Sequence, residues 1–431
     1  MSMPTSYLRN HVTEENVALH RAEVGVADRK VISEAENEIS DNPPIIAICH
    51  LSWKWVWQRP QQFLSRLART HPLLFVETHR SEIAEGYIEV VSDPGNPALR
   101  IARIHLPASR WSDGVFIDGL RRRLLKEWLA KEADGEFDGA ILWFNDPMAV
   151  TAYAGQLGEC MIVYDCMDEL SQFLGAPAEL IQRERDLVSM ADLIFCGGQK
   201  MRNKRLPLNP NTHFYPTGVD CKHFGQVSSR RSVIHSGLVE VRGPILGYFG
   251  VIDERLDYQL LSSLAMVNPA WSIVMIGPTA KIEPYQLPRM DNLHWLGPRS
   301  YAELPSLTTG MDVCIMPFAL NEATEFINPT KALEYMAAGK PVVSTDLDEV
   351  RLNFGEVVLI GRDQKEFIEH CRCQVRAPSK CRLELGLQLA QASTWDSIVQ
   401  RMQAHLEEVL FSKRRVSQDQ SRDAVNGGGY V

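Results

Sequence analysis

The sequence predicts an α/β protein made of two doubly wound domains. Short apolar runs alternate with amphipathic stretches between residues 45 and 195, and the same alternation returns between residues 245 and 345. The chain has 431 residues, of which 45% are hydrophobic, so it is long enough to fill two cores. These observations favour two domains of similar construction.

Composition and charge exclude several classes of protein. A net charge of −9 argues against a nucleic-acid-binding protein with a broad basic face. No apolar run approaches the roughly 18–20 residues of a membrane span, and the polar N-terminus does not resemble a signal peptide, so we expect a cytoplasmic protein. The nine cysteines and twelve histidines form no CxxC, HxxxH or HExxH pattern, so we expect no bound metal.

The first half of the chain predicts an N-terminal domain over residues 44–225, after a poorly ordered arm over residues 1–43. Expected strands span 45–49, 73–77, 140–144, 161–164 and 191–195, the last closing the sheet, with a helix over 61–70. Polar side chains follow several strand ends, where ligands bind in open α/β sheets: His50, Arg59, Asp146 and Asp165. The two aspartates are equally compatible with helix caps and with acceptor contacts.

Residues 112–132 read as an amphipathic helix with a basic side, which carries Arg121, Arg122, Arg123 and Lys126. Two interpretations are open. The helix can cover the sheet with a solvated basic face, or it can lie on an anionic membrane with Phe116 and Trp128 as anchors.

The second half predicts a domain over residues 232–395, then a helix over 396–412 and a disordered tail over 413–431. Expected strands span 245–249, 272–276, 294–296, 313–316 and 342–345, with helices over 259–266 and 301–308. Neither half contains GxGxxG or a Walker loop, and GYFG after the strand 245–249 is the nearest approach. A dinucleotide-dependent oxidoreductase is therefore disfavoured.

The stretch FINPTKALEYMAAGKPVVST, residues 326–345, reads as a helix, a tight turn and a buried strand. Asn328 is a good N-cap and Pro329 suits the first helical position. Free N–H groups at the helix start, with Thr330 and Lys331, suit a phosphate. Glu334, one turn deeper, can accept hydrogen bonds from a vicinal diol. Diphosphate and ribose together describe a nucleotide-sugar, although a surface Lys–Glu pair is the plainer interpretation of these two residues alone.

With its cap, turn and strand, this segment resembles the nucleotide-binding element of glycosyltransferase family 4 (group 1), of the GT-B class. The segments WKWVWQRPQQFLSRLA and VYDCMDELSQF resemble a bacterial branch of that family, related to teichuronic-acid and exopolysaccharide enzymes. The resemblance covers roughly residues 45–395. It implies two Rossmann-like domains facing a cleft, with the acceptor on the first and the donor on the second.

The resemblance also implies an activity, which is transfer of a sugar from a nucleoside-diphosphate-sugar. We expect this donor to be a UDP-sugar. The resemblance further implies that the configuration at the anomeric carbon is retained and that no metal or other cofactor is bound. The implied catalytic residues are Arg255, Lys331, Glu325 and Asp146. The implied donor contacts are Gly250, Gly277, Arg299, Asn328, Thr330, Lys331 and Glu334. The implied acceptor contacts are His50, Arg59 and Asp165. The family usually has two glutamates eight positions apart, and here Phe326 stands at the first of them.

We expect a glycan or lipid-linked acceptor, in cell-surface polysaccharide synthesis at the inner face of the cell membrane, and no nucleic-acid partner. Two alternatives stay open at this point. One is a nucleotide-sugar-binding scaffold without transferase activity, and the other is a nucleotide-sugar epimerase of the same fold.

Overall fold

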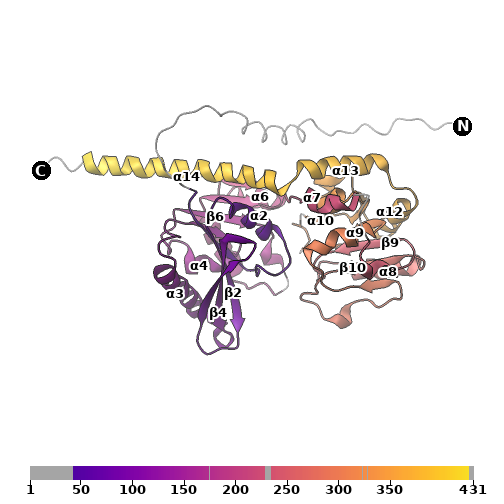
Figure 1. Ribbon diagram of the computed structural model, residues 1–431, viewed down its shortest axis with the longest axis horizontal. Helices are drawn as coiled ribbons and strands as arrows, with labels where there is room; N and C mark the ends of the chain where they lie inside the picture. Colours follow the sequence, from indigo (N-terminus) through magenta and orange to yellow (C-terminus); the bar gives the residue numbers. More distant parts are fainter. Residues whose placement is uncertain (1–41, 174, 229–233, 323, 328, 427–431) are drawn as a thin grey trace. The chain divides into compact units, whose positions relative to one another are not determined.

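A computed structural model describes residues 42–173, 175–228, 234–322, 324–327 and 329–426, with the backbone alone for 416–426. The arm expected over residues 1–43 lies outside this range except for its last two residues. The described chain contains two sheets (Figure 1).

The first sheet has eight strands in the order β3-β4-β2-β1-β5-β6-β7-β8. Neighbouring strands are parallel except β3 and β4, which pair antiparallel. The strands are β1 (Ile45–Cys49), β2 (Leu73–Ser81), β3 (Tyr87–Asp93), β4 (Asn96–Pro107), β5 (Ile141–Phe144), β6 (Met161–Cys166), β7 (Leu193–Cys196) and β8 (Thr212–Phe214).

Helices cover both faces of this sheet. They are α2 (Arg59–Leu67), α3 (Gly114–Glu132), α4 (Val150–Tyr153), α5 (Leu180–Met190) and α6 (Gln199–Arg205). One core lies between the sheet and α3, α4 and α5, and a second lies on the opposite face beneath α2. The central strands are buried on both sides and therefore read as continuous apolar runs.

The second sheet has six strands, all parallel, in the order β11-β10-β9-β12-β13-β14. The strands are β9 (Ile245–Phe249), β10 (Ser272–Ile276), β11 (Leu293–Trp295), β12 (Val313–Met316), β13 (Val342–Thr345) and β14 (Leu359–Gly361). The helices are α7 (Cys221–Phe224), α8 (Tyr258–Val267), α9 (Leu304–Thr309), α10 (Lys331–Ala337), α11 (Asp348–Phe354), α12 (Gln364–Arg376) and α13 (Lys380–Ala392). This strand order is that of a doubly wound Rossmann-like sheet.

The predicted fold class is confirmed, and the predicted strands appear within a few residues of their expected bounds. The prediction that residues 191–195 close the first sheet is wrong, because β8 pairs with β7 as a further strand. The hairpin of β3 and β4 is an addition that the sequence analysis did not anticipate. Its outer strand β3 is largely exposed and so lacks the apolar run that marks a buried strand.

The last helix, α14, spans Trp395–Asn426. The predicted helix end near residue 412 is therefore wrong. The prediction of a disordered tail from residue 413 is also wrong for residues 413–426. Residues 412–426 contain no proline or glycine, and they include one lysine, three arginines and two glutamines, which allow a helix to continue. The first part of α14 joins the core of the first domain, where the Trp395 ring meets the Phe63 ring edge-on at 5.3 Å between centroids. The chain therefore returns to its first domain (Figure 1).

Contacts of α3 support the covering-helix interpretation. Arg121 is buried, and its guanidinium donates to Asp118 and to the carbonyl oxygen of Met148. Trp128 belongs to the core, whereas Arg123 and Lys126 are exposed. The membrane-facing arrangement thus lacks one of its cations and one of its aromatic anchors. No helix in the described part of the chain combines the length and apolar character needed to span a membrane.

Candidate functional site

Ligands of doubly wound sheets bind beyond the carboxyl ends of the strands, where the strand order reverses. In the second sheet the order reverses between β9 and β12, so the loops after these strands flank that point. In the first sheet it reverses between β1 and β5. Most residues predicted for the site follow one of these four strands.

Two glycines bring the loops after β9 and β10 together. The N–H of Gly250 donates to the carbonyl oxygen of Ile276 at 2.9 Å, with φ of 156° at Gly250 and 148° at Gly277. A Cβ on Gly277 would lie 1.7 Å from the carbonyl oxygen of Gly250. Both positions therefore require glycine. Their role as donor contacts stays a prediction.

Lys331 and Glu334 form an ion pair at the start of α10. The Nζ atom of Lys331 lies 2.9 Å from a carboxylate oxygen of Glu334, whose side chain is only 6% exposed. The helix starts at Lys331 with Thr330 as its N-cap residue, so the predicted start with Pro329 at the first helical position is wrong. The carbonyl of Pro329 accepts a hydrogen bond from Ala332, which places it just before the first full turn. Asn328 lies outside the described residues.

A tyrosine of α10 fixes this helix against the end of β9. The N–H of Phe249 donates to the Tyr335 hydroxyl at 3.1 Å, and the two rings meet edge-on at 4.8 Å. Lys331 consequently projects over the Phe249 ring, with Nζ 5.3 Å from its centroid. The Cε atom of Lys331 would lie 3.4 Å from a Cβ on Gly250. The structure therefore brings Lys331, Glu334 and Gly250 together, as the sequence predicts.

Arg255 belongs to the same loop as Gly250. Its Nε and Nη2 atoms donate to both carboxylate oxygens of Asp253 at 2.6–3.0 Å. Burial raises the pKa of the Tyr248 hydroxyl, Arg255 lowers it, and Asp253 and Glu334 raise it. Arg255 and Glu334 thus both act on Tyr248, a residue of β9.

Two other predicted residues of the second domain lie apart from this group. Glu325 is half exposed and pairs with Lys200 of α6 at 3.3 Å. Arg299 is exposed and donates to the carbonyl oxygen of the preceding residue, Pro298. The structure therefore does not bring Glu325 or Arg299 to the Lys331 group, because each is turned toward other partners.

In the first domain, His50 is exposed on the loop after β1. A ring nitrogen, Nδ1, lies 3.1 Å from the carbonyl oxygen of Asn145. Asp146 accepts a hydrogen bond from the N–H of Met148 and so caps the short 3-10 helix that follows β5. Of the two interpretations left open for Asp146, the cap is the one that these contacts support.

Arg59 and Asp165 form a buried ion pair, so the prediction that both contact an acceptor does not fit their environment. Arg59 Nη2 and Nε donate to Asp165 Oδ1 at 2.8 and 3.0 Å, and Nη1 donates to the carbonyl oxygen of Tyr215. Asn145 donates to the other carboxylate oxygen of Asp165. Asp165 is 0% exposed and Arg59 7%. This pair ties the start of α2 to the end of β6.

The sequence analysis did not select Asp168, Asp253 or Phe173. The Phe173 ring lies beneath Arg255 and Lys281, at 5.4 and 4.6 Å from ring centroid to cation. Asp168 is half-buried in the loop after β6. Its position in the segment VYDCMDEL, just after a predicted strand, is the sequence feature that could have identified it. Among the described side chains, no group of three or more His, Cys, Asp or Glu is arranged to hold a metal ion.

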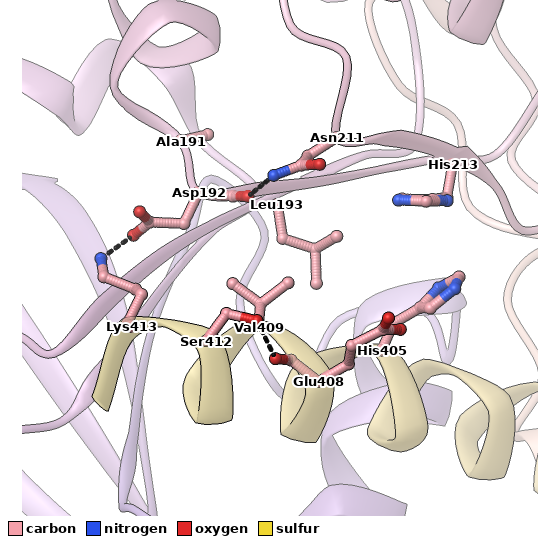
Figure 2. A pocket seen from close by; sticks show the side chains of 10 residues that line it. All are labelled: Ala191, Asp192, Leu193, Asn211, His213, His405, Glu408, Val409, Ser412 and Lys413. Atoms are coloured by element: carbon pink, nitrogen blue, oxygen red, sulfur yellow. Dashed lines mark hydrogen bonds and ion pairs between the residues drawn. The ribbon is translucent and has the colours of Figure 1, made fainter. Parts of the chain in front are cut away.

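A cavity of about 690 Å³ lies elsewhere, between α14 and the edge of the first sheet (Figure 2). Asp192 and Asn211 line it from the segments that precede β7 and β8, and His405 and Lys413 line it from α14. Lys413 is neutralised there by Asp192 at 2.6 Å. The cavity therefore lies at the amino ends of these strands, whereas Lys331 and Arg255 follow the carboxyl ends of strands in the second sheet.

Comparison with known sequences supports the resemblance. The family described as glycosyl transferases group 1 matches residues 243–375, which include β9, α10 and the loop of Arg255. The chain is 27% identical over 257 residues to TuaH of Bacillus subtilis (strain 168), named as a teichuronic acid biosynthesis glycosyltransferase. That match covers 55% of this chain and 62% of TuaH, so the chain spans less than two thirds of this relative.

Solved structures agree with the fold. Sucrose-phosphate synthase from Thermosynechococcus elongatus has a TM-score of 0.64 at 15% identity, over 86% of this chain and 100% of that one. The E. coli trehalose-6-phosphate structure bound with UDP-2-fluoro glucose has a TM-score of 0.62 at 13% identity, over 85% and 99%. The predicted resemblance to group 1 glycosyltransferases of the GT-B class is thereby confirmed.

Proposed function

We propose that this protein is a glycosyltransferase that moves a sugar from a nucleoside-diphosphate-sugar to a glycan or lipid-linked acceptor. The match to TuaH supports a role in cell-surface polysaccharide synthesis. The group 1 resemblance supports a donor site on the second domain. Retention at the anomeric carbon, independence of metal and a UDP-sugar donor are parts of the same proposal.

The observation that carries the proposal is the Lys331–Glu334 pair beside Gly250. The carboxylate is almost completely buried and the ammonium is partly exposed, so the pair offers a cation to a diphosphate and two oxygens to a ribose diol. A Cβ on Gly250 would lie 2.6 Å from the Tyr248 hydroxyl and 3.4 Å from the Cε atom of Lys331, so only glycine fits beside the pair. A surface ion pair, the plainer interpretation, does not require such burial.

Bond breakage at the anomeric carbon places negative charge on the diphosphate. Cations that are already oriented stabilise this charge more in the transition state than in the bound substrate. Lys331 and Arg255 are the proposed cations, and Arg255 is held in place by its two-oxygen contact with Asp253. Thr330 adds a hydroxyl within 3.4 Å of the Lys331 ammonium.

One observation favours a second candidate, a nucleotide-sugar-binding protein without transferase activity. Phe326, at the position of the family's first glutamate, packs against the core of the first domain, with Lys204 Nζ 5.7 Å from its ring centroid. The neighbouring Glu325 pairs with Lys200. Neither residue supplies a carboxylate to the donor sugar in this arrangement.

A thermal-shift panel of UDP, GDP, ADP and their sugars tests the proposal. A ligand at about 100 times its dissociation constant adds about 2.7 kcal/mol to the free energy of unfolding. We expect one nucleotide series to raise the melting temperature in the presence of EDTA. No shift with any nucleotide would contradict both candidates, and a shift without nucleotide release from the sugar would favour the inactive binder.

A further inference from the structure

Strands β2 and β4 reach farther than the central strand β1. β1 pairs with β2 only as far as Glu77, whereas β2 continues to Ser81 and pairs there with β4, which β3 flanks on its other side. The extension lies beyond the carboxyl end of β1, on the side of the sheet where α/β domains bind ligands. One face of it, which we call the hairpin face, carries the polar side chains of Glu77, His79, Ser81, Tyr87, Glu89, Arg103 and His105.

Rings from β3, β4 and β2 form a row across the hairpin face. In the strand register His105 lies opposite both Tyr87 and His79. Its ring stacks on Tyr87 with 4.5 Å between centroids and on His79 with 5.1 Å, and the planes differ by 11° and 18°. The Ser81 hydroxyl lies 3.0 Å from Nδ1 of His105. β3 is the outermost strand and Tyr87 is 47% exposed, so the outer side of the Tyr87 ring is open to a ligand.

Charged side chains form a second row, next to the rings. Arg103 lies opposite both Glu89 and Glu77, and it donates to Glu89 at 2.9 Å and to Glu77 at 3.2 Å. The Glu77 side chain is 5% exposed and also accepts a hydrogen bond from the N–H of Trp53 at 2.6 Å. The Glu89 side chain is 45% exposed. The inner carboxylate therefore holds the arginine in place, and the outer one is accessible.

The chemistry of these two rows fits an uncharged sugar. Tyr87 and Glu89 are two residues apart on β3, so the open ring and the accessible carboxylate point to the same side. The C–H face of a sugar ring can pack on the tyrosine while its hydroxyls donate to the carboxylate. The charged row has two carboxylates and one guanidinium, so it disfavours an anion. Burial, with His79 as a smaller contribution, lowers the pKa of His105, which therefore adds no charge at neutral pH.

We infer that the hairpin face is a subsite for an uncharged sugar of the acceptor glycan, with Tyr87 under the sugar ring and Glu89 bonded to its hydroxyls. Its place in acceptor binding rests on the proposed transferase function. Its side chains are already fixed by their contacts with one another, so little ordering is needed when a sugar binds. The subsite would supply acceptor contacts that the buried pair of Arg59 and Asp165 does not offer.

Sugar binding is measured directly, by saturation-transfer NMR titrations of the full chain at neutral pH. The probes are the methyl glycosides of glucose, galactose, N-acetylglucosamine and glucuronic acid. At least one of the three uncharged glycosides should bind, and more tightly than the glucuronide. Tyr87→Ala should raise the dissociation constant of that glycoside about 3- to 10-fold, the size of one aromatic stacking contact. Tyr87→Phe keeps the ring and should restore binding.

A matched control and a second variant separate sugar binding from a structural role. Tyr285→Ala removes a tyrosine of the second domain that is 77% exposed, and it should bind the glycoside like the wild type. Glu89→Gln keeps the shape of the side chain and removes the charge that strengthens the sugar's hydrogen bonds, so it should weaken binding as well. If Tyr87→Ala fails to fold, Glu89→Gln decides the test.

Failure of this inference is distinguishable from failure of the transferase proposal. Wild type that binds none of the four glycosides, or equal binding by wild type, Tyr87→Ala and Glu89→Gln, overturns the subsite and leaves the donor site untouched. Tighter binding of the glucuronide overturns the assignment to an uncharged sugar. Nucleotide release from UDP-glucose, GDP-mannose and ADP-glucose is measured separately on the wild type. Absence of release from all three overturns the transferase function, and the role in acceptor binding with it, even where the glycoside binds.

Discussion

Glu334 is the residue whose environment says most about the site. Its carboxylate is nearly inaccessible and is paired with Lys331, one turn earlier on the same helix. An isolated carboxylate at this depth would be strongly destabilising, so the lysine neutralises it while no ligand is bound. A bound donor can take over both partners, with the diphosphate facing the lysine and the ribose hydroxyls facing the glutamate.

Glu334→Gln keeps the shape of this side chain and removes its charge. The hydrogen bonds from the ribose hydroxyls would then lose their charge assistance, so UDP affinity should fall by about 1.5–3 kcal/mol, roughly 10- to 150-fold. Calorimetric titration with UDP measures this change. Glu127→Gln, on the exposed side of α3, is the matched control and should bind like the wild type. If Glu334→Gln binds UDP as tightly as the wild type, the Lys331–Glu334 pair is an ordinary contact within a helix and not part of a donor site.

At the scale of elements, α14 joins the last part of the chain to the first domain. The Trp395 side chain is 2% exposed and packs against Phe63 of α2. Trp395→Ala should therefore lower the free energy of unfolding by about 3–5 kcal/mol, as a large aromatic deletion from a core does. Urea denaturation measures this loss. Phe411→Ala, at a side chain that is 62% exposed on the same helix, should change little, and equal effects of the two would contradict the packing described.

The contact between α14 and β8 also predicts a dependence of stability on pH. Burial, with His405 and Arg202 as smaller contributions, lowers the pKa of His213 to about 4. The unfolded chain, with a histidine pKa near 6.5, takes up a proton before the folded chain does. This contribution to stability is complete above about pH 6.5 and is lost as the pH falls from there toward 4.

His213→Asn removes the titrating group and should flatten this part of the profile. The comparison is the difference between urea midpoints at about pH 7.5 and about pH 5, measured for wild type and variant. The wild type should lose more stability over this interval than the variant. Identical losses would show that His213 does not titrate differently in the folded and unfolded chains.

At the scale of the whole molecule, local sequence patterns were sufficient to predict most of the fold. The buried parallel strands β1, β5, β9 and β12 are continuous apolar runs, and such runs can be recognised from sequence. The exposed strand β3 lacks this pattern, and the long polar helix at the chain end resembles a disordered tail in composition. Those elements depend on partners distant in the sequence, and composition does not reveal the partners.

The same limit applies to the site. Lys331 and Glu334 are three residues apart on one helix, so their pairing could be predicted. The partners of Arg59 and Glu325 could not, because Asp165 is 106 positions from Arg59 and Lys200 is 125 positions from Glu325. Both residues were given ligand contacts from their place in a motif, whereas the fold gives them ion pairs. Asp168 was not selected because nothing local distinguishes it from Asp165, which Arg59 neutralises.

The most direct test of the central claim is nucleotide release from a nucleoside-diphosphate-sugar by wild type and Lys331→Ala, in the presence of EDTA. Loss of one donor to a developing charge lowers turnover about 10²–10³-fold. Because Lys331 also neutralises Glu334, the folded fraction of the variant must be measured first, and Lys331→Ala combined with Glu334→Gln serves as the control for an unpaired carboxylate. The account predicts metal-independent release by the wild type and a loss of that size in both variants. Equal turnover in wild type and Lys331→Ala would contradict it.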